Sequence, residues 1–483
     1  MNEDKEPRPV PPVFSSEQAQ NKAECAAIWY AYAAEAEQSG DDFGARMGYV
    51  NAWHEQPEEL RYYEGVLGYF HRSELLGELL KTYQIGTQIH PHHEPTFINF
   101  PNLLNLYGHY EEAKSVSETW LSRNSRSLEA WGNLGNSFRG LGDFEQAKAC
   151  FLKVLKVDPK HAIAGFNYSN ILLAQGNFEE GWVYYNYRLN LTGYENLQKR
   201  NAARIWTGQS LKGKSIFVFA EQGIGDTLMF CRYLHPLVKK GAKVFFESQK
   251  SVAWILRNLL GNQVEVIERE TLEEKLDLKT DYQIPLLSLP GLLDKGEPMA
   301  PASESSVKEI DSPRAKELIS GLEGFKVGLC WQGNPRAAID LGRSVSLAFF
   351  ESLMSNSWAD FVSLQGRDGL EDIEAFASEF NNFHYLIDLD VESGPFAETV
   401  SLIQGLDLVI TTDTSIAHLA ALLGKECWVI LQKYPEWRWG LDQEESVWYS
   451  GVRLFRQKEI GKWESVIEEL NQALKEDVPQ QFD

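Results

Sequence analysis

Two short polar motifs lie where an apolar run is expected to pass into a helix. The first, EQGIGDTL, follows SIFVFA (215–220) and contains Gly223, Gly225 and Asp226. The glycines allow backbone amides to turn toward a ligand, and a helix start favours an anion. Asp226 is either a cap of that helix or an active carboxylate presented at the end of the strand. The motif alone leaves both interpretations open.

The second motif, DTSIAHLAALLGK, follows the apolar run DLVITT (407–412). Asp413, Thr414 and Ser415 place side-chain oxygens and free amides at a helix start, where a diphosphate would be stabilised. His418 follows one turn later. It either reaches the same ligand or is a buried structural histidine.

A third segment, CWQGNPRAAIDLGRSVSL, contains a glycine turn with Asn334 and two arginines, Arg336 and Arg343. Arginines near a cleft in a strongly acidic chain are candidates for binding phosphate. The structural alternative is that they are ordinary exposed arginines.

The segment YPEWRWG (434–440) places Trp437 and Trp439 on either side of an arginine. These indoles are candidates for stacking on a base or sugar. The alternative is packing against a predicted C-terminal helix at 462–475.

The elements that position these motifs alternate between strand and helix. Strands are predicted at 215–220, 242–249 and 264–268, and again at 326–332, 360–365, 382–389, 407–412 and 426–432. Such alternation favours parallel sheets with crossover helices. We therefore predict two consecutive Rossmann-like α/β halves with a ligand in the cleft between them.

The first 190 residues have a different period. Prolines and glycines recur at multiples of 34 residues: Pro57, Pro91 and Pro159; Gly40, Gly108, Gly142 and Gly176. A fixed period of this length is typical of helical repeats that stack into a solenoid. Two positions depart from the pattern, with Glu74 in the glycine column and Ser125 in the proline column.

The best copy, at 128–161, resembles the tetratricopeptide repeat. The residues that match its pattern are Trp131, Leu134, Gly135, Phe138, Ala147, Phe151 and Pro159. The resemblance implies a concave groove that docks a protein or peptide, and a dimerisation arm or spacer is the alternative. The nearby HPHH stretch (90–93) is predicted to be a solvated loop and not a metal site.

The polar motifs carry a second resemblance. GIGD after the first strand and DTSIAHLAALLGK after a later one are similar to the heptosyltransferase-like GT-B glycosyltransferases. With VGLCWQGNP, RSVSL, FVSLQ and WRWGLD behind the repeats, the chain resembles bacterial repeat-containing glycosyltransferases, a group that includes flagellin-modifying enzymes.

This resemblance implies an inverting enzyme that needs no metal. Asp226 matches the proposed general base, which takes a proton from the acceptor hydroxyl. Asp413, Thr414 and His418 match the donor-binding signature, and Arg343 takes the place of a basic residue that contacts donor phosphate. The family uses lysine there, so this last match is looser. We also assign Gly223, Gly225, Asn334 and Ser415 to donor binding. DLD (388–390) imitates a metal-binding motif of another architecture, and we assign it no metal.

Net charge and cysteine content limit the classes of partner and the cellular compartment that we expect. The net charge is −23, and the acidic excess is spread through the chain, which argues against nucleic acid and anionic lipid as partners. Five scattered cysteines favour a reducing compartment. No apolar signal segment or spanning run is present in the sequence, so we expect a cytoplasmic protein without a transmembrane segment.

These observations predict a helical solenoid followed by a GT-B module. The predicted parts are a disordered tail (1–14), the repeats (15–190), a linker (191–213), an acceptor-side half (214–310), a nucleotide-sugar half (325–455) and a C-terminal helix (456–476). The expected function is transfer of a sugar from a nucleotide-sugar to a protein hydroxyl, with no cofactor or metal and with the acceptor protein in the repeat groove. Transfer to a glycan or lipopolysaccharide, or a scaffold that only senses a nucleotide-sugar, are the alternatives.

Overall fold

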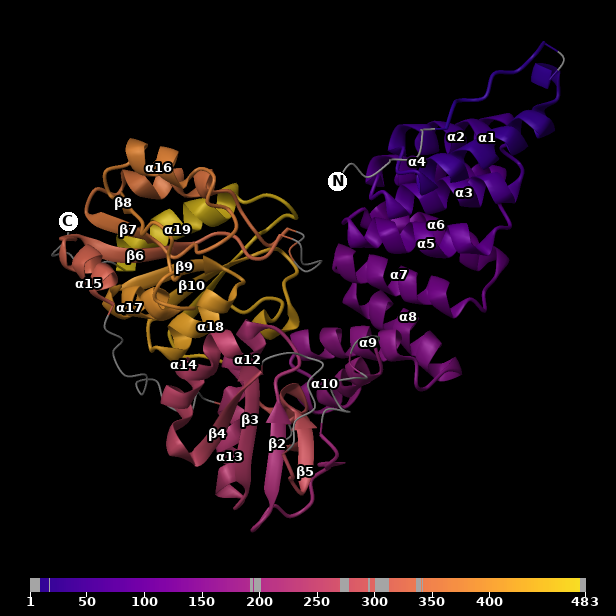
Figure 1. The fold of residues 1–483 in the computed structure, drawn as a ribbon. Helices are drawn as coiled ribbons and strands as arrows, with labels where there is room; N and C mark the ends of the chain where they lie inside the picture. Colours follow the sequence, from indigo (N-terminus) through magenta and orange to yellow (C-terminus); the bar gives the residue numbers. More distant parts are fainter. Residues whose placement is uncertain are drawn as a thin grey trace, which may run out of the picture. The chain divides into compact units, whose positions relative to one another are not determined.

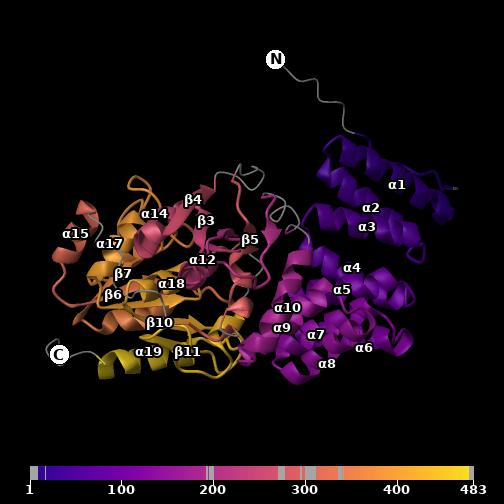
Figure 2. The same cartoon turned by 90° about the horizontal axis from the view of Figure 1, so that it is seen from below.

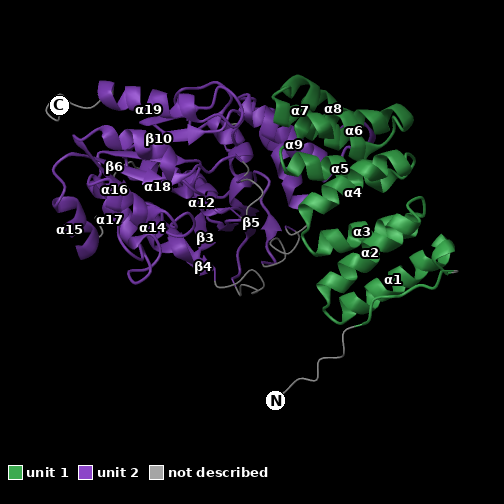
Figure 3. Cartoon of the chain, turned by 90° about the horizontal axis from the view of Figure 1, so that it is seen from above, with its two compact units in different colours: residues 1–153 green, residues 154–483 purple. Residues whose placement is uncertain are grey.

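The computed structural model describes residues 9–16, 18–191, 194, 201–269, 278–293, 296–299, 312–335, 340 and 342–477. The chain divides into two compact units, Met1–Lys153 and Val154–Asp483 (Figure 3). The domain boundaries expected from the sequence are not tested by this division and stay predictions.

The first unit is an array of antiparallel helix pairs (Figure 1). Its helices are α1 (Lys22–Gln38), α2 (Asp42–Glu55), α3 (Leu60–Arg72), α4 (Leu76–Ile89), α5 (Glu94–Leu106), α6 (Tyr110–Arg123), α7 (Leu128–Leu141) and α8 (Phe144–Val157), the last of which continues into the second unit. Small residues let the paired helices approach. A Cβ on Gly135 would lie 2.7 Å from Cε1 of Phe151, and Ala147 is fully buried.

The glycine column of the repeat marks the turn inside each pair. Gly40, Gly108, Gly142 and Gly176 all have positive φ, between 75° and 82°, which L-residues with a Cβ rarely adopt. Glu74, the departure in this column, takes the same conformation with φ 56°. The degenerate second repeat therefore keeps the turn geometry although it lacks the glycine.

The second unit begins with one more helix pair, α9 (Ala162–Ala174) and α10 (Phe178–Tyr185). This pair packs on the α/β part of the same unit. Trp182 is 1% exposed and donates from Nε1 to the carbonyl oxygen of Gly296 at 3.0 Å, and a Cβ on Gly291 would lie 2.9 Å from the Trp182 Cβ. The last pair thus shares the hydrophobic core of the sheets.

Two parallel sheets form the rest of this unit (Figure 1). The first has the order β1-β5-β2-β3-β4. Its strands are β1 (Arg204–Ile205), β2 (Ser215–Phe219), β3 (Lys243–Gln249), β4 (Val264–Arg269) and β5 (Tyr282–Pro285). The short β1 pairs with β5, and Trp206 and Leu211 beside it are buried. Part of the segment expected as a linker therefore belongs to the sheet.

The second sheet has the order β11-β10-β9-β6-β7-β8. Its strands are β6 (Phe325–Cys330), β7 (Ala359–Ser363), β8 (Phe383–His384), β9 (Leu408–Thr412), β10 (Glu426–Leu431) and β11 (Val452–Arg456). The helices around the two sheets include α13 (Leu234–Lys239), α14 (Lys250–Leu260), α15 (Pro313–Ser320), α16 (Ile373–Glu379), α17 (Ala397–Gly405) and α19 (Glu464–Asp477). The predicted order of a helical solenoid followed by two parallel-sheet α/β halves is confirmed, and the assignment of these halves to the GT-B type stays a prediction.

Candidate functional site

Each sheet has a switch point, where the chain changes the side on which it adds strands. In the first sheet β3 and β4 are added on one side of β2, and β5 on the other; in the second, β7 and β8 lie on one side of β6, and β9 on the other. Ligands of open parallel sheets bind beyond the carboxyl ends of the strands at such points. The three polar motifs follow β2, β6 and β9, so the topology brings them to the two switch points.

Asp226 lies in the first turn of α12 (Ile224–Phe230), just beyond β2. Its Oδ2 accepts a hydrogen bond from the backbone N–H of Gly223 at 3.1 Å. Its Oδ1 accepts from Nη2 of Arg438, in a partly buried ion pair. The carboxylate therefore caps its own helix and also binds a cation from the other half of the unit.

Arg438 comes from a short 3₁₀ turn, η10 (Trp437–Trp439), that follows β10. The residue is 8% exposed. Besides Asp226, its Nη1 lies 3.4 Å from Oε2 of Glu436. Burial alone would lower the pKa of Arg438, but the negative charges of Asp226, Glu436 and Asp413 together raise it. The guanidinium is thus a fixed positive charge among acidic groups that come from both halves.

His418 lies on α18 (Ser415–Leu422) and is 2% exposed. Its Nδ1 is 2.9 Å from the hydroxyl oxygen of Tyr449, and its ring stacks on Trp439 with centroids 5.3 Å apart. Burial, with Arg438 and Arg232 nearby, holds the pKa of His418 well below its ordinary value. The imidazole is therefore neutral near pH 7.

The helices α12 and α18, from the two halves, lie against each other (Figures 1 and 2). The two helices approach closely at Gly225, where a Cβ would lie 2.8 Å from Cδ2 of His418 and 3.7 Å from the Cα of Ser415. Glycine is required here by the close approach and not by a turn. The structure thus brings the GIGD and DTSIAH motifs into contact.

The remaining residues of the second motif surround the start of α18. The Oγ1 of Thr414 accepts from the backbone N–H of Ile416 at 3.2 Å and lies 3.0 Å from Oγ1 of Thr411. Asp413 is 7% exposed and acts electrostatically on Arg438. Thr414 is therefore the cap of this helix, and Asp413 is the member of the motif whose negative charge acts on Arg438.

Arg343 lies beyond β6 and is bound within its own segment. Its Nε and Nη2 donate to Oδ1 of Asp340 at 3.1 and 3.0 Å, and its guanidinium lies where a Cβ of Gly333 would be. It acts on the Cys330 thiol, whose pKa burial raises and Arg343 lowers. Asn334 is exposed on the same loop. Arg336 lies outside the described residues.

Trp437 and Trp439 are buried, at 4% and 2% exposure. Trp437 packs on Trp182 and Tyr185, with centroids 5.4 and 5.8 Å away, and Trp439 stacks on His418. Neither ring offers an open face to a base or sugar. The alternative, that both rings pack inside the protein, therefore holds. Their packing partners belong to α10 and α18 and not to the C-terminal helix.

Two residues of this cluster were not singled out from the sequence. Arg438 stands between two tryptophans in the sequence, and WRW after a late strand is the signal that points to it. Tyr185, from the last helix pair, donates its hydroxyl to Oε1 of Gln222 at 3.2 Å. Burial raises the pKa of Tyr185, Arg188 and Arg438 lower it, and Asp226 and Glu436 raise it further. This tyrosine therefore lies beside the Asp226–Arg438 pair.

The DLD and HPHH stretches, which we considered as metal sites from the sequence, make structural contacts instead. In the DLD stretch, Asp390 accepts from the backbone N–H groups of Glu398 and Thr399 at 2.7 and 3.1 Å, which makes it a cap of α17. In HPHH, His90 is 7% exposed and its Nε2 lies 2.9 Å from the carbonyl oxygen of Pro57, so the solvated-loop prediction is wrong for this residue. Among the described residues, no three His, Cys, Asp or Glu side chains are placed to share a metal ion.

Comparison with known protein families identifies one repeat of the helical array. The tetratricopeptide repeat family matches residues 128–161. This segment is a tetratricopeptide repeat. In the part of the chain that the structure describes, no helix is both long enough and apolar enough to cross a membrane.

Other similarities cover longer parts of the chain. It is 26% identical over 338 residues to Protein FlbA of Caulobacter vibrioides, which covers 65% of this chain and 55% of that protein, so the chain spans about half the length of this curated relative. A glycosyl transferase family 9 structure from Veillonella parvula is 12% identical with a TM-score of 0.38, covering 57% of this chain and 92% of its own. A tetratricopeptide repeat protein from Parabacteroides merdae is 21% identical with a TM-score of 0.31, covering 35% and 66%.

Proposed function

We propose that this chain is a glycosyltransferase that moves a sugar from a nucleotide-sugar to a hydroxyl group of a protein. The observation that carries the proposal is the cluster of Asp226, Arg438 and Asp413, which joins the two switch points of the α/β unit. A carboxylate for the acceptor and a cation for the departing phosphate are the two groups that this reaction needs.

The proposed reaction uses no covalent intermediate. Asp226 takes the proton of the acceptor hydroxyl, and the oxygen forms a bond to the anomeric carbon of the donor sugar. The bond between that carbon and the phosphate oxygen breaks, and the nucleoside diphosphate leaves with the electron pair. Attack opposite the leaving group inverts the anomeric configuration. Arg438 and the N-terminal end of α18 would stabilise the charge that develops on the diphosphate.

Metal independence and the absence of a cofactor are part of the proposal. A buried arginine supplies permanent positive charge next to the proposed base. Guanidinium binds phosphate oxygens in a planar, two-pronged geometry. We therefore expect sugar transfer to continue at the same rate in the presence of a metal chelator.

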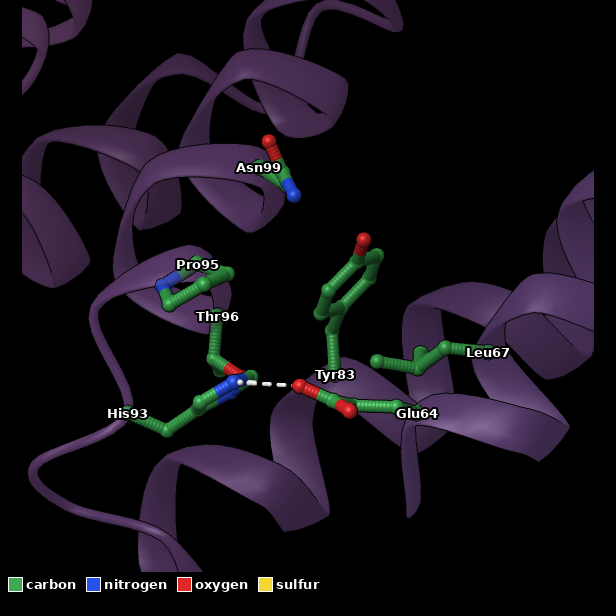
Figure 4. A pocket seen from close by; sticks show the side chains of 7 residues that line it. All are labelled: Glu64, Leu67, Tyr83, His93, Pro95, Thr96 and Asn99. Carbon is green, nitrogen blue, oxygen red and sulfur yellow. Dashed lines mark hydrogen bonds and ion pairs between the residues drawn. The ribbon is translucent and has the colours of Figure 1, made fainter. Parts of the chain in front are cut away.

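The helical array would dock the acceptor protein, as repeat solenoids commonly do. A pocket of about 170 Å³ lies between α3, α4 and α5. Its lining consists of Glu64, Leu67, Tyr83, His93, Pro95, Thr96 and Asn99 (Figure 4). His93 closes one side through Nε2, 3.1 Å from Oε1 of Glu64. Such a polar-rimmed pocket suits one side chain of a docked segment.

The test incubates the full chain with radiolabelled sugars on UDP, GDP, ADP and dTDP, together with cytosolic protein of the source organism. We expect label from one donor in a fraction that proteinase degrades. Label in protease-resistant glycan or lipid would support the alternative acceptor class. Binding of a nucleotide without any transfer would support the sensing scaffold, and flagellin is the first purified acceptor to try.

A further inference from the structure

The arginine–carboxylate pair in the candidate site blocks the group that the proposed reaction needs as a base. Asp226 is occupied on both oxygens, by Arg438 on Oδ1 and by the Gly223 N–H on Oδ2. The Arg438 guanidinium and an acceptor hydroxyl would both donate to Oδ1, so they compete for the same oxygen of Asp226. The arrangement in the structure is therefore a resting one, with the cation on the base.

Arg438 has hydrogen-bonding capacity that Asp226 does not use. Within the described part of the chain, its Nε is buried without a hydrogen-bond partner. Its Nη1 has a long contact of 3.4 Å to Glu436. A buried N–H that lacks a partner is costly, so the guanidinium is better satisfied by a ligand with several acceptor oxygens. A diphosphate is such a ligand, since its oxygens match the guanidinium fork.

We infer that Arg438 is shared between Asp226 and the donor diphosphate, so that donor binding draws the guanidinium away and frees Asp226 for the acceptor hydroxyl. This inference rests on the proposed function. It adds an order to the reaction, because the base becomes available only once the donor is present.

The acidic surroundings make the exchange depend on this one cation. Glu436 and Asp413 lie close enough to act on Arg438, and Asp226 contacts it directly. Without the guanidinium, three carboxylates would repel a doubly negative diphosphate. With it, the diphosphate replaces one anionic partner of Arg438 by another, and Asp226 keeps its hydrogen bond from Gly223.

Competition between Asp226 and the ligand gives a test that needs no acceptor. We would titrate UDP, GDP, ADP and dTDP into the full chain by calorimetry, for wild type, Arg438→Met, Asp226→Asn and the double variant. Loss of the guanidinium should weaken binding about tenfold or more. Asp226→Asn removes the competitor, so it should tighten binding severalfold. The double variant should gain less over Arg438→Met than Asp226→Asn gains over the wild type, because the relief of repulsion remains but the competition needs the arginine.

Two further variants control for misfolding of Arg438→Met and for the loss of an arginine elsewhere in the unit. Arg438→Lys retains the charge without the fork and should bind between wild type and Arg438→Met, which covers the case in which Arg438→Met is poorly folded. Arg257→Met, which breaks a surface ion pair to Glu268 in the same unit, is the matched control and should bind as wild type. Melting curves of every variant without ligand report its folding.

The outcomes separate the two proposals. Unchanged or weaker binding by a folded Asp226→Asn variant would overturn the exchange, and so would a double variant that keeps the full gain. Wild-type binding that Arg438→Lys and Arg438→Met leave unaltered would overturn it as well, while the proposed function would stand. No binding of any nucleotide by the wild type would reject the proposed function itself.

Discussion

Gly225 and His418, from opposite halves of the α/β unit, approach so closely that a Cβ on the glycine would lie 2.8 Å from Cδ2 of the imidazole. The ring has little freedom to move, since it is bound to Tyr449 and stacked on Trp439. This contact fixes how far α12 can lie from α18, and it therefore sets the separation between Asp226 and the residues beyond β9.

Gly225→Ala should push the two helices apart. Overpacking of this kind costs about 1–3 kcal/mol, and the gain of alanine over glycine in a helix, up to ~1 kcal/mol, offsets only part of it. We expect a lower melting temperature and weaker nucleoside diphosphate binding. Gly223→Ala is the control, because its Cβ would lie 3.4 Å from Oδ2 of Asp226, an ordinary contact. Equal losses in both variants would contradict this explanation.

Asp226→Asn should stop transfer while the donor still binds. An amide cannot take the acceptor proton, and loss of a general base slows a reaction about 10²–10⁴-fold. Initial rates of sugar transfer, measured at saturating donor, give the effect on kcat. Transfer at the wild-type rate would remove Asp226 from the mechanism.

His418 should make the protein less stable in mild acid. Burial keeps its folded pKa well below 6.5, so the unfolded state binds the extra proton. The stabilising contribution of the neutral ring is complete above pH 6.5 and is lost as the pH falls below it. His418→Asn should therefore flatten the decline of the free energy of unfolding between pH 7 and 5, by up to about 1.4 kcal/mol per pH unit. A decline as steep as in the wild type would show that other groups cause it.

The buried pair between Arg188 and Glu221 should be a main stabilising link of the second unit. Both side chains are fully buried, with Nη2 2.5 Å from Oε1. Arg188→Met leaves Glu221 as an uncompensated charge and should cost about 3–5 kcal/mol in urea denaturation. Adding Glu221→Gln should restore part of that loss. Lys458→Met, in an exposed pair with Glu469, should cost under about 1 kcal/mol.

Asn99→Trp should fill the pocket between α3, α4 and α5. If this pocket docks the acceptor, KM for the acceptor protein should rise severalfold, with kcat and the affinity for the nucleoside diphosphate unchanged. Ser115→Trp on α6, an exposed position that does not line the pocket, is the control. An unchanged KM in a folded Asn99→Trp variant would place docking elsewhere.

Local patterns were enough to predict most of the fold. The 34-residue period predicted helix pairs because each turn needs a residue with positive φ, and even Glu74 adopts it. Apolar runs predicted β2, β3, β6 and β9 because central strands of parallel sheets are buried on both faces. The two-residue β1 lacks such a run, and its pairing with β5 joins residues 78 positions apart, so no local signal could reveal it.

The candidate site was predictable only in part. Asp226 and Asp413 follow predicted strands, and the switch points bring them to the site. Arg438 lies 212 residues from its partner Asp226, and only the packing of the two halves shows that they meet. The same holds for Tyr185, which comes from a helix pair expected to belong to the docking array.

The link through Trp182 and Arg188 also limits where the array can change length. A deletion up to residue 190 would remove both side chains and leave Glu221 buried without its cation. The last helix pair is therefore part of the α/β unit, and whole repeats can be gained, lost or exchanged only upstream of it. Exchange of the upstream repeats would therefore change which acceptor protein is docked, and the packing around the proposed reaction centre would stay the same.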